Sequence, residues 1–302
     1  MQHTKPASFL ALFFASLFWG ASFVFTKTLL VDFNPIDLVL IRSIIASLFL
    51  ITICLLFFKK EMKIKKKDLI IICAFSFFEP FLYFIFETYS LKFTSASIVS
   101  IIIATIPVFT AFLSRYYYKE YFSKLNIFGI IISVAGIAIM MLPDLSDMIQ
   151  MRGMLLAFLA VIAAVAYGFF IRKLSCEYNP VVLTAYQNIV ALALFLPLFL
   201  ILDIKNGFPD PIILLTSVNI TNIMILSIFC SSIAFIFFIY GIQHLGLGKA
   251  VIFSNLIPVF TVIISIIFLK EQFTLAKCIG LFTVVIGVFL VQKQQVEPIK
   301  HL

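Results

Sequence analysis

The residues that could do chemistry in this sequence are the charged side chains inside its long apolar runs. Glu79 and Glu87 lie in a run from 69 to 91, and Arg42 lies in a run from 36 to 58. At about 100° per residue, Glu79, Tyr83 and Glu87 share one face of a helix. A charge within a membrane normally faces the protein interior and marks a functional site. The stripe therefore predicts a cavity wall in which Glu79 binds a proton or a cationic group.

These charged residues also have structural interpretations. Glu79 could be protonated and hydrogen-bonded to a neighbouring helix, with a role in packing alone. Arg42 and Glu87 lie at a similar depth, and we expect them to form a salt bridge that neutralises both charges. A gate that breaks and reforms this pair is the alternative interpretation.

Other side chains are candidates for the same cavity, because polar-edged aromatic rings and buried polar groups suit a solute site. Trp19 and Ser22 share one face of the first apolar run, and Tyr167 is the counterpart of Trp19 in the second half. Asn255 lies near the centre of a later run, where its amide must bond to another helix or to a solute. Core packing explains the aromatic residues equally well.

Three prolines inside apolar runs are candidate helix breaks. Pro80, Pro107 and Pro258 each lack the N–H group that a helix interior requires. A break near the middle of a span could supply a hinge or free carbonyl groups to a binding site. Kinks that serve packing alone are equally consistent with the sequence.

The composition places these residues in a membrane protein. Of the 302 residues, 63% are hydrophobic and 12% are charged, whereas soluble domains carry about 25% charged residues. These values exclude a soluble domain, a disordered chain and a disulfide scaffold. The five cysteines and three histidines are scattered, so we expect neither a metal site nor a cofactor. The net charge of +8 is assigned to basic loops at the membrane surface and not to nucleic-acid binding.

The hydrophobic pattern predicts an all-α polytopic membrane protein with ten transmembrane helices. The predicted spans are residues 8–30, 36–58, 69–91, 95–115, 124–143, 153–172, 180–202, 217–241, 247–269 and 275–292. With the N-terminus inside, fifteen of the 22 Lys and Arg residues lie on the inner side and six on the outer side. Because basic residues accumulate in cytoplasmic loops, we expect both termini to be cytoplasmic.

The chain contains an internal repeat. Residues 101–136 and 252–287 align without gaps at a shift of 151, and 13 of the 36 positions are identical. The matches include a Pro-Val-Phe-Thr segment, two glycines, and a Lys-Glu pair that ends at Glu120 in one copy and at Glu271 in the other.

This repeat predicts two domains, 1–147 and 148–302, with five spans in each. Because five is an odd number, the second domain must be inverted in the membrane relative to the first. Inverted repeats are an architecture of secondary transporters, whose solute site lies near the midplane between the halves.

The order of several motifs resembles the EamA family of the drug/metabolite transporter superfamily. The motifs are Trp19-Gly20, Arg42, the segment 89–97 and the two Pro-Val-Phe…Lys-Glu blocks. The resemblance covers nearly the whole chain and implies ten helices around a central cavity. It further implies transport, usually export, of small metabolites such as amino acids, although some relatives take solutes up.

We therefore predict a secondary transporter that works by alternating access. The expected cargo is an amino acid or a related amphipathic compound, exported across a bacterial cytoplasmic membrane, with Glu79 as the candidate proton-coupling site. The sequence has no phosphate-binding Gly-x-x-x-x-Gly-Lys-Ser/Thr loop, so the chain itself is not expected to hydrolyse ATP. The expected partners are the solute and membrane lipid, without nucleic acid, and the oligomeric state stays open.

Other functions remain as alternatives at this point. An uncoupled facilitator or an importer of a small metabolite fits the same features. A channel or lipid scramblase would need a continuous pore or groove, which no linear feature indicates. An intramembrane enzyme is disfavoured, because Glu79 and Glu87 are about 12 Å apart along a helix and could not share a proton.

Overall fold

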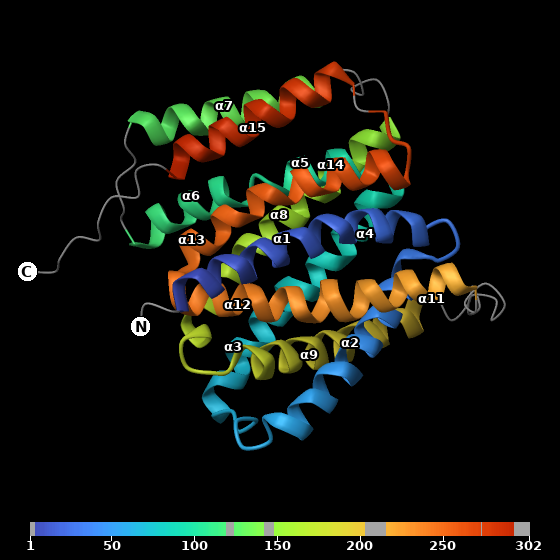
Figure 1. Cartoon of the computed structure of the whole chain (residues 1–302), viewed down its shortest axis with the longest axis vertical. Helices are drawn as coiled ribbons and strands as arrows, with labels where there is room; N and C mark the ends of the chain where they lie inside the picture. Colours follow the sequence, from blue (N-terminus) through green and yellow to red (C-terminus); the bar gives the residue numbers. More distant parts are fainter. Residues whose placement is uncertain (1–3, 119–123, 142–147, 203–215, 273, 293–302) are drawn as a thin grey trace, which may run out of the picture.

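The computed structural model describes residues 4–118, 124–141, 148–202, 216–272 and 274–292, which form a bundle of helices (Figure 1). In chain order the helices are α1 (Thr4–Leu29), α2 (Pro35–Phe57), α3 (Lys66–Ser76), α4 (Tyr83–Phe93), α5 (Ala96–Ile103), α6 (Ile106–Tyr118), α7 (Lys124–Met141), α8 (Met148–Ser175), α9 (Pro180–Leu202), α11 (Ser217–Met224), α12 (Ala234–Leu245), α13 (Leu247–Ile252), α14 (Ile257–Phe268) and α15 (Leu275–Gln292). Two π-helical turns, Phe77–Leu82 and Ile225–Ile233, join α3 to α4 and α11 to α12. A 3-10 segment, Phe253–Leu256, joins α13 to α14.

Seven helical stretches in the described part of the chain are long and apolar enough to cross a membrane. They are Pro6–Leu29, Pro35–Phe57, Lys66–Phe93, Met148–Ser175, Pro180–Leu202, Ser217–Leu245 and Leu247–Phe268. Three shorter apolar helices, Ala96–Ala111, Ile127–Ile139 and Leu275–Leu290, coincide with the remaining predicted spans. The predicted all-helical, polytopic architecture is therefore confirmed, and the inverted ten-span arrangement stays a prediction.

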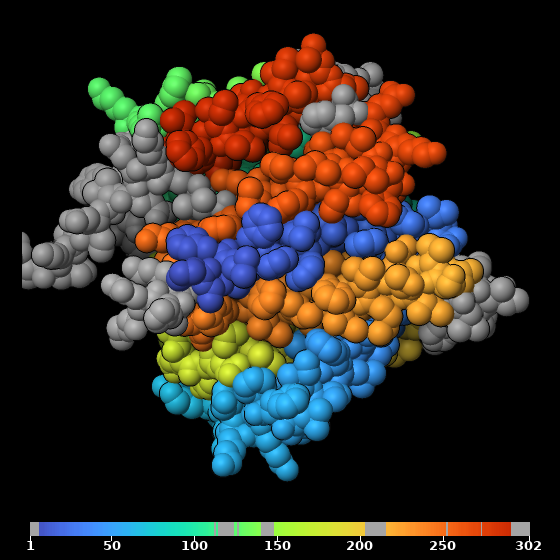
Figure 2. Space-filling model, viewed as in Figure 1, coloured from blue at the N-terminus to red at the C-terminus, as the bar shows by residue number. Residues whose placement is uncertain are grey.

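The helices pack in pairs that bring distant parts of the sequence together. α7 packs on α15 at one edge of the bundle, α2 packs on α9 towards the opposite edge, and α4 packs on α8 between them (Figure 1). α1 packs between α12 and α14, and Figure 2 shows these three helices as adjoining bands on one face. The start of α1 and the end of α15 lie at the same end of the bundle (Figure 1).

Local sequence explains where several of these helices begin. Pro35 stands in the first turn of α2, where a missing N–H group costs nothing. The Ser95 side chain caps α5 by accepting a hydrogen bond from Ile98 N, and Thr216 caps α11 in the same way. α6 begins at Ile106 and α14 begins at Ile257, which are the residues that the 151-residue shift aligns.

Two glycines allow α7 and α15 to approach closely. A Cβ atom added at Gly136 would lie 2.8 Å from Val284 N, and one added at Gly287 would lie 2.5 Å from Ser133 N. Both distances are far shorter than a van der Waals contact, so a larger residue at either position would push the helices apart. Small residues serve the same purpose at many membrane helix interfaces.

Replacement of Gly287 by leucine should lower the thermal unfolding temperature of the protein in detergent. The added side chain would collide with the Ser133 backbone, and overpacking of this kind costs about 1–3 kcal/mol. Ala138→Leu, on the exposed face of α7, is the matched control and should leave the unfolding temperature unchanged. Equal unfolding temperatures for Gly287→Leu and the wild type would contradict the close packing of this pair.

Candidate functional site

The polar stripe of the third span faces an internal cavity of about 60 Å³. The cavity wall comes from α1, α2, the Phe77–Leu82 turn, α4, α8, α12 and the segments around the breaks before α6 and α14. Seven residues singled out in the sequence line it: Trp19, Ser22, Arg42, Glu79, Tyr83, Glu87 and Tyr167. This volume accommodates a few water molecules or a small chemical group, and it is much smaller than a drug-sized site.

The cavity lies beside a break in the helix of the third span. Glu79 has extended backbone angles, φ −143° and ψ 120°, within the Phe77–Leu82 turn. Because Pro80 has no N–H group, a regular helix cannot continue through this point. The backbone carbonyl of Glu79 accepts a hydrogen bond from Gln187 Nε2 of α9, at 3.1 Å. The structure therefore contains the break expected at Pro80, and α9 satisfies the carbonyl that the break frees.

The carboxyl group of Glu79 is left to the cavity. The residue is 7% exposed. Its bond to Gln187 uses the backbone carbonyl, and its carboxyl group makes no hydrogen bond to the described residues. A buried carboxylate normally has a counter-charge or several donors. In this conformation the Glu79 carboxyl can therefore hold a proton or pair with a cation that enters the cavity.

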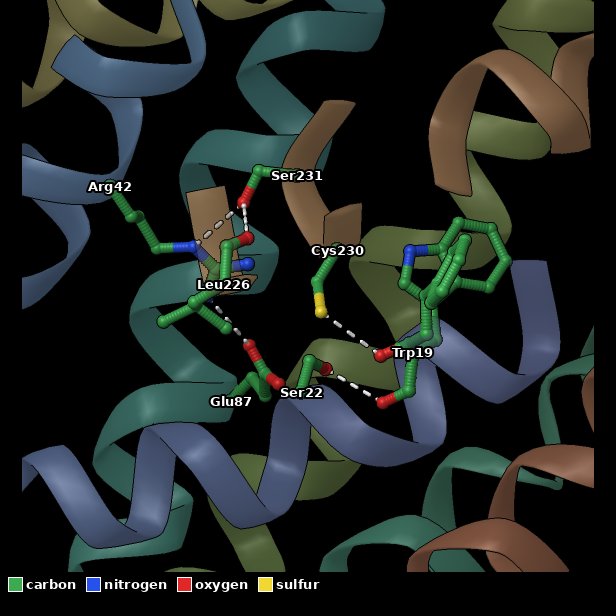
Figure 3. Close-up of polar contacts among 8 residues, drawn as sticks. Trp19, Ser22, Arg42, Glu87, Leu226, Cys230 and Ser231 are labelled. Carbon is green, nitrogen blue, oxygen red and sulfur yellow. Dashed lines mark hydrogen bonds and ion pairs between the residues drawn. The ribbon is translucent and has the colours of Figure 1, made fainter. Parts of the chain in front are cut away.

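Arg42 and Glu87 form a buried ion pair at the same cavity. Arg42 Nη1 lies 3.8 Å from Glu87 Oε2, and both side chains are 2% exposed. Arg42 Nε donates a hydrogen bond to Ser231 Oγ at 3.0 Å (Figure 3). The guanidinium also lies over the ring of Phe84, 3.7 Å from the ring centroid. The pair thus has the geometry of the expected salt bridge, and its use as a gate stays a hypothesis.

Aromatic rings form one continuous wall of the cavity. Phe235 of α12 lies at the centre of this wall, with ring centroids 5.2 Å from Trp19 and 6.3 Å from both Tyr167 and Phe84. Trp19 also meets Phe238 at 5.0 Å. Trp19 and Tyr167 therefore face the cavity, which the sequence could not decide. Phe235 was not predicted, because nothing in its local sequence separates it from the many other phenylalanines.

The two other prolines lie just after helix breaks that touch the cavity. α5 ends at Ile103 and α6 begins at Ile106, so Pro107 stands in the first turn of α6. Pro258 stands in the first turn of α14. Asn255 lies in the Phe253–Leu256 segment but is not among the residues that line the cavity, where its neighbour Ser254 is found instead. The place of Asn255 in a solute site therefore stays a prediction.

A second polar cluster joins α14 to the α4–α5 turn. Glu271 accepts hydrogen bonds from Ala96 N at 2.8 Å and from Ser97 Oγ at 2.6 Å, so its carboxylate sits on the N-terminus of α5. Lys27 Nζ donates to the carbonyls of Leu91 and Thr94. No role was predicted for Glu271, although its place in the repeated Lys-Glu pair was a signal. The matching pair Lys119-Glu120 lies outside the described residues.

Comparison with known proteins identifies the family. The model of the EamA-like transporter family matches residues 7–142 and, a second time, residues 151–292. The chain belongs to this family. An uncharacterized transporter of Archaeoglobus fulgidus is 27% identical to this EamA-like chain over 280 residues, which cover 92% of the chain and 96% of that protein. The chain is therefore a multi-pass membrane protein and a membrane transporter.

Two further relatives bear on its architecture. An uncharacterized protein of Methanocaldococcus jannaschii is 33% identical over 134 residues, which cover 44% of this chain and 92% of that protein. A chain solved under the description "Crystal structure of protein" has a TM-score of 0.70 over 95% of this chain and 96% of its own length. At 15% identity this second likeness is one of fold. No three His, Cys, Asp or Glu side chains of the described residues converge on a possible metal site.

Loss of one member of the Arg42–Glu87 pair should destabilise this EamA-like transporter more than loss of both. Glu87→Gln leaves a buried guanidinium without its counter-charge, which costs about 3–5 kcal/mol. Adding Arg42→Gln should restore part of that loss. Unfolding temperatures of the wild type, both single variants and the double variant form a double-mutant cycle. Strictly additive shifts would mean that the two charges are not coupled.

Proposed function

We propose that this chain is a secondary transporter that exports a small metabolite by alternating access. Its cargo would be an amino acid or a related amphipathic amino compound. Its site would be the cavity at Glu79, which would have to widen beyond the 60 Å³ of this conformation to admit that cargo. The observation that carries the proposal is a buried carboxyl group with no hydrogen-bonding partner among the described residues, facing a cavity in a member of a transporter family. A group in that situation interacts with whatever enters the cavity.

The proposed architecture is two inverted five-span halves, 1–147 and 148–302. The family model matches once in each half, and the relative from Methanocaldococcus jannaschii has about the length of one half. The π-helical turn that holds Glu79 has a counterpart in the turn that holds Cys230. The three shorter apolar helices would complete the ten spans. Inverted halves can exchange conformations, which converts an outward-open cavity into an inward-open one.

The proposed location is a bacterial cytoplasmic membrane, with both termini in the cytoplasm. The excess of Lys and Arg residues on the inner side of the predicted topology supports this orientation. The lysine-rich segment from Lys59 to Lys67 contributes six of these charges. The start of α1 and the end of α15 lie at one end of the bundle, which is compatible with termini on the same side (Figure 1).

Glu79 is the proposed site of proton coupling. The groups that face the same cavity from other positions are Tyr83 and Glu87 of α4, Tyr167 of α8 and Arg42 of α2. Arg42 is already paired with Glu87, so no cation of the described protein neutralises Glu79. A proton and a cationic solute would then compete for one carboxyl group, which links their movements. An uncoupled facilitator or an importer would use the same cavity without this exchange.

The test is transport by purified protein in liposomes, with a panel of radiolabelled amino acids and amines. For the solute that moves, Glu79→Gln should abolish accumulation driven by a proton gradient and retain counterflow, because the glutamine keeps the shape of the side chain and cannot take up a proton. Glu177→Gln, on the exposed turn after α8, is the control and should behave as the wild type.

Each other outcome removes part of the proposal. Equal proton-driven accumulation by the wild type and Glu79→Gln would reject Glu79 as the coupling site. Counterflow by a wild type that never accumulates solute against its gradient would identify an uncoupled facilitator. The absence of movement for every solute would reject transport of small amino compounds.

A further inference from the structure

We infer that the cavity selects an organic monocation, an amphipathic amine without a carboxylate, over the corresponding amino acid. This inference rests on the proposed function and narrows its cargo. Three observations carry it: the charge balance of the cavity wall, the role of Arg42 as counter-charge of Glu87, and the aromatic wall of the same cavity.

The charge balance of the wall favours one added positive charge. The acidic and basic residues that line the cavity are Arg42, Glu79 and Glu87. With all three ionised, they sum to one negative charge. An amine cation cancels this charge, whereas a zwitterionic amino acid leaves it in place. In a buried site an uncompensated charge is strongly unfavourable, so the cation is the better match.

Arg42, the cation of the cavity wall, already serves as the counter-charge of Glu87. The Arg42 guanidinium faces Glu87 at 3.8 Å and donates from Nε to Ser231 (Figure 3). It also lies over the Phe84 ring, while its Nη1 has no hydrogen-bond partner among the described residues. A carboxylate that captured Arg42 would leave Glu87, which is 2% exposed, without its counter-charge. The Ser22 hydroxyl donates to the Trp19 carbonyl at 2.7 Å. The hydroxyls of Tyr83, Tyr167 and Thr110 in the wall are neutral and bind a carboxylate less strongly than a guanidinium does.

The break before α6 does not supply amide donors for a carboxylate through Val108 N or Phe109 N. At the break before α6, Val108 N and Phe109 N both donate to the Thr105 carbonyl. These amides are among the first of α6, and such groups would otherwise attract an anion. The same segment contributes Ile106 to the cavity wall. These two amides are therefore used within α6, and the polar side chain that α6 adds to the wall is the neutral hydroxyl of Thr110.

The aromatic wall suits the cation and its apolar tail. Trp19 contacts Phe235 and Phe238 edge to face, with ring centroids 5.2 Å and 5.0 Å apart. Ring faces attract ammonium groups as well as guanidinium groups, and Arg42 already occupies the face of Phe84 in this wall. An ammonium group at Glu79 would place an adjoining hydrocarbon chain against these rings.

Trp19 provides a direct measurement of binding, because it is the single tryptophan of the chain and lines the cavity. Full-length protein in lipid nanodiscs is titrated with 3-methylbutylamine and, separately, with leucine, which differ by the carboxylate alone. Phenethylamine and phenylalanine form a second matched pair. We expect each amine to change Trp19 fluorescence saturably and to bind at least tenfold more tightly than its amino acid.

Two variants separate charge recognition from general effects. Glu79→Gln should reduce the preference for the amine at least tenfold, while Glu177→Gln makes the same chemical change on the surface and should leave the preference intact. Amino acids that bind as tightly as their amines would overturn the inference. Amine binding that is unchanged in Glu79→Gln, or the absence of a saturable response to either amine, would also overturn it.

The liposome assay distinguishes the failure of this inference from the failure of the proposed function. Counterflow of leucine or phenylalanine without any preference for their amines would keep the transporter and reject the monocation. The absence of movement for every solute, together with saturable amine binding at Trp19, would keep the site and reject transport.

Discussion

The absence of water from the centre of a bilayer is the constraint on which this structure depends. Every backbone carbonyl that leaves a helix, and every charge placed there, must find its partner in the protein. The break at Glu79 meets this demand through Gln187. Arg42 meets part of it through the charge of Glu87, a hydrogen bond to Ser231 and the ring of Phe84, while its Nη1 has no hydrogen-bond partner among the described residues. These contacts fix how α2, α4, α9 and the Ile225–Ile233 turn stand around the cavity.

The partners lie mostly in the opposite half of the chain. Gln187 and Ser231 of the second half bind Glu79 and Arg42 of the first half. Thr261 Oγ1 donates to the Gly20 carbonyl, which ties α14 to α1. The Glu271 carboxylate covers the N-terminus of α5. The first half therefore supplies the cavity's charges, and the second half supplies neutral partners and much of its aromatic wall.

The Glu79 carboxyl departs from this pattern of satisfaction. Its own carbonyl is bonded, its helix is broken beside it, and its side chain faces the cavity at 7% exposure. A side chain in this state costs stability unless a proton or a ligand is present, which is why such departures gather at functional sites. The structure keeps the neighbouring Arg42 away from Glu79 by pairing it with Glu87. The cavity consequently retains one acidic group for its cargo.

Local sequence was enough to predict the helical class, the candidate spans, the repeated segments, the family and the polar stripe of the third span. These features follow from local properties: an apolar run of sufficient length must be helical in a membrane, and a charge within it must face inward. The break at Pro80 was predictable for the same reason, because a missing N–H group acts on its own helix.

The neutral residues that face the cavity could be identified from the folded structure alone. Phe235 and Phe237 are two residues apart in one apolar run, yet Phe235 lies at the centre of the aromatic wall and Phe237 does not line the cavity. Asn255 could be placed at the cavity from its sequence, and the fold gives that position to Ser254. An aromatic ring is equally stable against lipid and against protein, so its local sequence carries no preference. A buried charge has no such freedom, and the charged residues could therefore be placed from the sequence while their neutral partners could not.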